Sequence, residues 1–85
     1  MPIVFVEQGF RFHFFSREGN PREPVHVHVS RPGGTAKLWL YPEVRLAYNR
    51  RLTSRELREA GEIAAKRRQE LTDAWNAHFA GADSG

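Results

Sequence analysis

The strictest pattern in the chain is an alternation of valine and histidine, Val25-His26-Val27-His28-Val29. Successive side chains of a β-strand point to opposite faces, so the three valines would share one face and the two histidines the other. Pro24 favours an extended conformation for the residue before it. The pattern therefore predicts a strand over residues 25–30, with one apolar face that must be buried and one face that carries imidazoles.

Other segments have the β-branched and aromatic content of strands, and turn-forming residues separate them. Gln8-Gly9 predicts one hairpin turn and Arg31-Pro32-Gly33-Gly34 predicts another. A loop rich in proline, glycine and asparagine is expected over residues 16–24. The other predicted strands are residues 3–7, 10–15 and 35–41, with a short fifth strand at residues 44–47.

The last third of the chain has helical character. Thr53-Ser54-Arg55-Glu56 has the form of a capping box, and apolar residues then recur at spacings of three, four and seven. Gly61 weakens a helix, so the pattern is compatible with one long helix or with two that meet there. Gly81 is the expected stop. The predicted apolar stripe is Leu57, Ala60, Ala64, Leu71, Trp75 and His78, with Phe79 beside it.

Strands followed by helix predict an α+β fold. The helical part is expected to pack on one face of a four- to five-stranded, mainly antiparallel sheet. We expect a single domain over residues 1–80 and a flexible C-terminal tail at 81–85. The side chains predicted to face the helix are Phe10, Phe12, Phe14, Val25, Val27, Val29, Ala36, Leu38, Leu40, Val44 and Leu46.

Composition limits the class of protein. The chain has 85 residues, few enough that a partner protein or a second copy would help to bury apolar surface. It has no cysteine and no apolar run of about 18 residues, so neither a disulfide nor a membrane-spanning helix is predicted. The N-terminal segment lacks the basic flank of a signal peptide, so we expect a cytoplasmic protein.

The charges are unevenly distributed. Residues 1–52 carry eight basic and four acidic side chains, whereas residues 53–85 carry five basic and six acidic ones. Eleven of the thirteen basic residues are arginine, whose planar guanidinium binds carboxylate or phosphate through two hydrogen bonds. The basic surplus therefore lies on the part of the chain that is predicted to form the sheet.

If the apolar residues face the helix, the opposite sheet face is the candidate working surface. Aromatic and basic side chains in this number favour a contact with a partner protein or a second copy. The same side chains are also typical of single-stranded RNA binding, with Arg50 and Arg51 adding phosphate contacts. The predicted members of this face are Arg11, His13, Phe15, His26, His28, Lys37, Trp39 and Tyr41.

The histidines open two further alternatives. His26 and His28 project the same way from one strand, and His13 on a neighbouring strand would complete a three-nitrogen zinc site. Without such a metal no cofactor is expected, and the same three histidines are candidate catalytic residues acting as general acid or base. Arg11 or Lys37 would then stabilise phosphate charge. The residue pattern leaves open whether the protein is an enzyme.

The chain carries an ordered set of motifs: Pro24-Val25-His26-Val27-His28-Val29, Ala36-Lys37-Leu38-Trp39-Leu40, Leu46-Ala47-Tyr48-Asn49, Glu56-Leu57 and Trp75-Asn76 with Phe79. This set resembles a family of short bacterial proteins, the domain-of-unknown-function family four-one-six-zero. The resemblance implies a compact α+β protein and supplies no established activity. Members of that family are often encoded beside another small protein, an arrangement similar to that of toxin–antitoxin pairs, which implies a partner protein and favours an RNA-directed role.

Together these observations predict a small cytoplasmic bacterial interaction module that works with a partner protein as a component of a toxin–antitoxin-like pair. The alternative is a protein that binds or cleaves RNA, with or without a metal, through the histidine-bearing face. The predicted binding surface is Arg11, Lys37, Trp39, Tyr41, Arg50 and Arg51, beside His13, His26 and His28.

Overall fold

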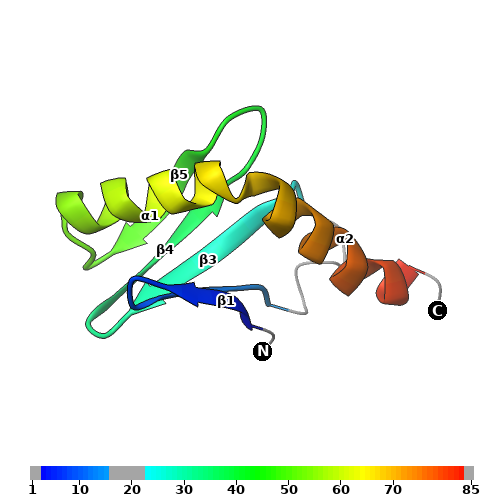
Figure 1. Cartoon of the computed structure of the whole chain (residues 1–85), viewed down its shortest axis with the longest axis horizontal. Coiled ribbons are helices and arrows are strands. Elements are labelled where there is room, and N and C mark those ends of the chain that lie inside the picture. The colour runs from blue at the N-terminus through cyan, green and yellow to red at the C-terminus, as the bar shows by residue number, and fades with distance from the viewer. Residues whose placement is uncertain (1–2, 16–22, 84–85) are drawn as a thin grey trace.

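A five-stranded antiparallel sheet forms one layer of the protein (Figure 1). The computed structural model describes residues 3–15 and 23–83. Each strand pairs with its neighbour in the chain, so the strand order is β1-β2-β3-β4-β5 and the edges are β1 and β5. The strands are β1 (Ile3–Glu7), β2 (Phe10–His13), β3 (His26–Arg31), β4 (Gly34–Trp39) and β5 (Arg45–Arg50).

Two helices form the second layer, so the predicted α+β architecture is confirmed. They are α1 (Ser54–Lys66) and α2 (Arg68–Asp83). The predicted capping box is present at the start of α1: the Glu56 N–H donates to Thr53 Oγ1 at 3.1 Å, and the Thr53 N–H donates to Glu56 Oε1 at 2.9 Å. Helix α2 continues to Asp83, past the stop expected at Gly81. Most of the predicted loop at 16–24 lies outside the described residues.

The helical part divides at Arg67, whereas Gly61 lies inside α1. The Arg67 guanidinium lies 3.4 Å from the centroid of the Phe5 ring and donates to Glu7 and Glu70 at 2.8 Å. These contacts fix the chain against β1 at the point where the helix changes direction (Figure 1). A tertiary contact, which propensity does not record, therefore decides where the helix divides.

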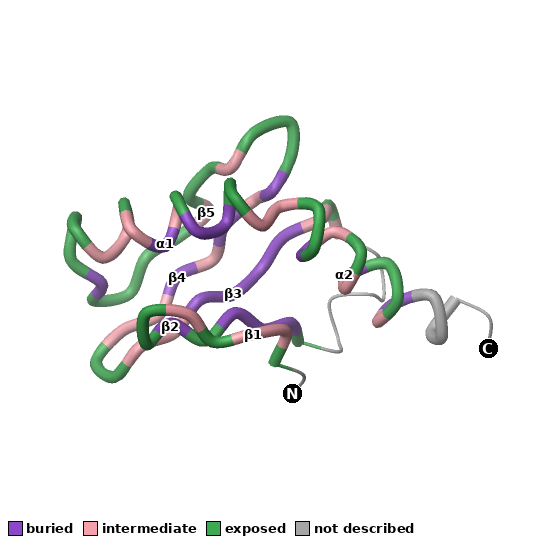
Figure 2. The backbone as a smooth tube through the Cα atoms, in the orientation of Figure 1, coloured by how far each residue is buried: buried purple, intermediate pink, exposed green. Residues whose placement is uncertain are grey.

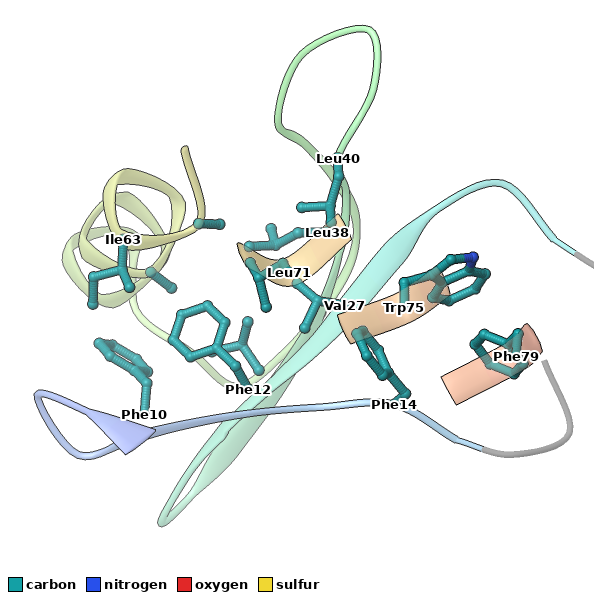
Figure 3. Packing of buried hydrophobic residues seen from close by; sticks show 13 residues of the cluster. Phe10, Phe12, Phe14, Val27, Leu38, Leu40, Ile63, Leu71, Trp75 and Phe79 are labelled. Carbon is teal, nitrogen blue, oxygen red and sulfur yellow. The ribbon is translucent and has the colours of Figure 1, made fainter. Parts of the chain in front are cut away.

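The core lies between the sheet and the helices. Figure 3 shows Phe10, Phe12 and Phe14 directed at the helical layer, with Phe10 beside Ile63 of α1 and Phe14 beside Trp75 and Phe79 of α2. The Phe14 and Trp75 rings meet edge to face, with centroids 5.4 Å apart. The buried cluster consists of Phe10, Phe12, Phe14, Val27, Val29, Leu38, Leu40, Ala60, Ile63, Ala64, Leu71, Trp75 and Phe79.

The ends of the two layers do not coincide. Helix α2 extends beyond the sheet, towards the C-terminus of the chain (Figure 1). Burial is concentrated on β2, β3 and β4, while the edge strand β5 is almost entirely exposed (Figure 2). Leu46, predicted to face the helix, has an exposed fraction of 50% because it lies on that edge. Residues 3–15 and 23–83 contain no helix long and apolar enough to cross a membrane.

Candidate functional site

The strand register divides the sheet into two faces, as the alternation predicted. Val27 lies opposite Leu38 and both belong to the core, whereas His28 lies opposite His13 on one side and Lys37 on the other. Residues opposite one another on adjacent strands share a face. The valines of β3 therefore point to the helices and its histidines point away. We call the side that carries His28 the outer face.

Three histidines form one cluster on this face, which we call the histidine cluster: His13, His26 and His28. The ring centroids of His13 and His28 are 5.8 Å apart, with the planes inclined by 20°. The centroids of His26 and His28 are 5.3 Å apart and their planes are nearly perpendicular. The structure thus brings together the three histidines that the sequence singled out.

The expectation that these histidines are exposed is wrong. Their exposed fractions are 4% for His13, 0% for His26 and 3% for His28. The Phe15 ring covers His28, with centroids 4.4 Å apart, and Trp75 of α2 reaches His26 with centroids 4.8 Å apart. Trp75 belongs to α2, which runs past the end of the strands (Figure 1). Alternation sets the direction of a side chain, but it does not say which rings will close over it.

The chemistry of the cluster is constrained by its surroundings. His26 Nδ1 lies 2.8 Å from the carbonyl oxygen of Pro24, and because a carbonyl can only accept, Nδ1 carries the proton. No group of three or more metal-binding side chains is arranged to hold a metal ion within residues 3–15 and 23–83. The set of His13, His26 and His28 therefore lacks, in the described part of the chain, the arrangement that the zinc alternative requires.

Two tyrosines lie where the alternation did not place them. Tyr41 is not with the histidines: β4 ends at Trp39, and the Tyr41 hydroxyl lies 2.9 Å from Thr72 Oγ1 of α2. Tyr48 is there instead, with its hydroxyl 3.4 Å from His28 Nδ1. A register shift in the β4–β5 pair leaves Ala47 without a partner, which turns Tyr48 to the outer face. Sequence reasoning missed Tyr48 because simple alternation from Leu46 points it at the helices.

The cations of the outer face differ in how they are neutralised. Lys37 forms an ion pair with Glu23 at 2.9 Å and lies 4.5 Å from the Trp39 ring centroid. In the described part of the chain, no ion pair involves Arg11 or Arg50, nor the predicted surface residue Arg51, which follows β5 and is not placed on this face by the strand register. All three are exposed. The outer face thus presents positive charge that the described residues do not compensate.

The helical side is different, because its charges are paired. The hydrogen bond from the Thr53 backbone, followed by one from the Arg31 side chain, holds the pKa of Glu56 below its usual value. The hydrogen bond from Arg67 likewise lowers the pKa of Glu70. Carboxylates whose pKa is lowered in this way are held ionised by partners within the chain. They are not available to neutralise the arginines of the outer face.

Exposed apolar side chains also belong to the outer face. Val6 lies opposite Arg11 and Ile3 opposite His13, and their exposed fractions are 58% and 50%. Phe15 is 41% exposed and Tyr48 is 39% exposed. This face therefore combines apolar, aromatic and cationic side chains, and it is the side of the sheet away from the two helices (Figure 1).

A family model matches residues 9–76, which include β2 to β5, the whole of α1 and the histidine cluster. The chain belongs to the family described as Domain of unknown function (DUF4160). No curated protein and no solved structure matches it. Membership of DUF4160 agrees with the motif resemblance and assigns no activity.

Proposed function

We propose that this DUF4160 protein is a small interaction module whose outer face binds a partner protein. The observation that carries the proposal is the group of exposed apolar side chains on the side of the sheet away from the helices. Ile3, Val6 and Phe15 are each 41% exposed or more. Apolar side chains gathered on one surface and rimmed by cations are typical of a contact with another protein.

The kind of apolar residue favours protein over RNA as the ligand. Bases stack on aromatic rings and phosphates bind cations, but neither gains from an aliphatic side chain. Val6 and Ile3 are the two most exposed of the outer-face apolar residues. They gain most when another apolar surface removes them from water, at roughly 25 cal/mol per Å².

The partner we propose is a small protein encoded beside this one, as is often the case for members of the family that the motifs resemble, in a pair like that of a toxin and its antitoxin in the bacterial cytoplasm. Such a partner would cover the outer face and add apolar area that a chain of 85 residues has difficulty in burying alone. A homodimer through the same face is the other arrangement that covers it.

Co-expression with the co-encoded neighbour, followed by size-exclusion chromatography and calorimetric titration, tests the proposal. A complex is expected. Val6→Glu puts a carboxylate into the apolar contact and should weaken binding about tenfold or more, which corresponds to about 1.4 kcal/mol. Leu46→Glu is the matched control, because Leu46 is 50% exposed on the other edge strand and opposite Leu38 of the core face. The proposal would be contradicted if the chain stayed monomeric alone and formed no complex with the neighbouring protein.

A second candidate, RNA binding, is favoured by one observation. The Arg50 guanidinium lies 5.3 Å from the centroid of the exposed Tyr48 ring, which combines a stacking surface with a phosphate-binding group. Cleavage by the histidine cluster is harder to support, because the three rings are at most 4% exposed. A fluorescent oligouridylate whose affinity falls steeply with salt would support this candidate. Absent or salt-insensitive binding would remove it.

A further inference from the structure

One row of residues crosses all five strands on the outer face, and we call it the arginine row: Val6, Arg11, Ser30, Thr35 and Arg50. Each lies opposite the next, from β1 to β5. We infer that this row is the place where the partner's acidic side chains bind, as carboxylates of an extended segment lying across the strands. This inference rests on the proposed function and names the chemistry of the partner.

The row has an arginine on each side of two short side chains. Arg11 is on β2 and Arg50 is on β5, with Ser30 and Thr35 between them. Adjacent strands are about 4.8 Å apart, so three steps place the two arginine backbones about 14 Å from each other. Serine and threonine are short, and their hydroxyls can accept or donate hydrogen bonds. Thr35 Oγ1 donates to the Val29 carbonyl oxygen at 3.1 Å and keeps its acceptor capacity.

The surface is hollowed at the Arg11 end of this row. A depression of about 530 Å³ is lined by Val6, Gly9, Arg11, Ser30, Arg31 and Pro32. Arg31, the second cation there, is already engaged: it pairs with Glu56 at 3.2 Å and lies 3.9 Å from the Phe10 ring centroid. Arg11 has no ion pair within the described part of the chain. The hollow therefore offers the apolar side chains of Val6 and Pro32, the Ser30 hydroxyl, and one guanidinium whose charge no described residue pairs.

The spacing selects the form of ligand. An extended peptide advances about 3.4 Å per residue, so side chains at positions i and i+4 point the same way about 14 Å apart. That distance is close to the roughly 14 Å expected between the backbones of Arg11 and Arg50. Two carboxylates at i and i+4 would each meet a guanidinium, and the side chain at i+2, which points the same way, would lie above Ser30 and Thr35. Val6 beside Arg11 would contact an apolar residue of the same segment, which a nucleic acid does not supply.

The test uses a fluorescein-labelled octaglutamate peptide as the probe, with binding followed by fluorescence anisotropy at low and moderate salt. The full chain should bind it, and affinity should fall as salt rises, because exposed charges are screened. The double variant Arg11→Gln/Arg50→Gln should lower the affinity tenfold or more. Arg55→Gln/Arg58→Gln is the matched control. It removes the same charge from two exposed arginines of α1 and should change the affinity less than twofold.

Two results would overturn the inference. One is an equal loss in both double variants, which would mean that net charge alone binds the peptide. The other is failure of octaglutamate to bind while an octauridylate binds through Arg11 and Arg50, which would make the row a phosphate site. Neither result would change whether the neighbouring protein forms a complex with this chain, so the proposed function is tested separately. Conversely, octaglutamate binding that depends on Arg11 and Arg50 supports the row even if that neighbour proves not to be the partner.

Discussion

The histidine cluster and the arginine row lie side by side on the same sheet face, yet they differ in burial and in their contacts. In β3, His28 is 3% exposed and enclosed by rings, while Ser30, two residues on, belongs to the open row. The histidines contact each other, Phe15 and Trp75, whereas Arg11 and Arg50 have no ion pair in the described residues. Part of this face is therefore closed by packed rings, whereas the neighbouring part carries the exposed arginines Arg11 and Arg50.

The largest effect is expected at Trp75, which encloses the histidine cluster from α2. Its ring contacts Phe14, Phe79 and His26, and it is 1% exposed. Trp75→Ala should lower the free energy of unfolding by about 3–5 kcal/mol, because a large aromatic is replaced by a cavity. Urea unfolding measures this. Trp75→Phe keeps most of the volume and should lose clearly less, and equal losses in the two variants would contradict the packing described.

The second-largest change in the free energy of unfolding is expected from a comparison of two residues within β3. His28→Ala removes a buried ring with several ring contacts and should lower the free energy of unfolding by about 2 kcal/mol. Ser30→Ala, on the same face of the same strand, should change it by about 0.5 kcal/mol or less. Thermal and urea unfolding of the two variants provide the measurement. If Ser30→Ala proved as damaging as His28→Ala, the division of this face into a closed and an open part would be wrong.

The smallest effect concerns the paired charges of the helical side. The folded pKa of Glu56 lies below its unfolded value, so its stabilising contribution is present above the unfolded pKa and is lost as pH falls through the folded pKa. The unfolding free energy of the native chain should therefore decline as the pH falls below about 5. Glu56→Gln removes this titrating carboxyl and should flatten the decline. An unchanged slope, in parallel urea titrations, would show that Glu56 is not held ionised.

The sequence predicted what depends on local alternation. Each β3 side chain has the predicted direction because a strand has a period of two, and the capping box at Thr53 is found because it involves residues three apart. The position of Tyr48 was not predictable, since it depends on an unpaired residue in the β4–β5 ladder. The division of the helix at Arg67 was missed for a similar reason, because it depends on contacts with Phe5 and Glu7 of the distant β1.

The candidate site follows the same rule. Sequence reasoning gathered the right histidines, but their enclosure depends on Phe15 and on Trp75, which is nearly 50 residues away along the chain from His26. The arginine row was missed as a unit. Arg11 and Arg50 were each identified as surface cations, but only the registers of four strand pairs show that they lie in one line with Ser30 and Thr35.

Titration of unlabelled octaglutamate into the isotope-labelled chain, followed by NMR, tests the division of the outer face most directly. We predict that the largest amide shifts occur at Arg11, Ser30, Thr35 and Arg50, while the ring protons of His13, His26 and His28 stay in place. Shifts concentrated on the histidine rings, with the arginine row unchanged, would contradict the account: the closed part of the face would then be the one that binds.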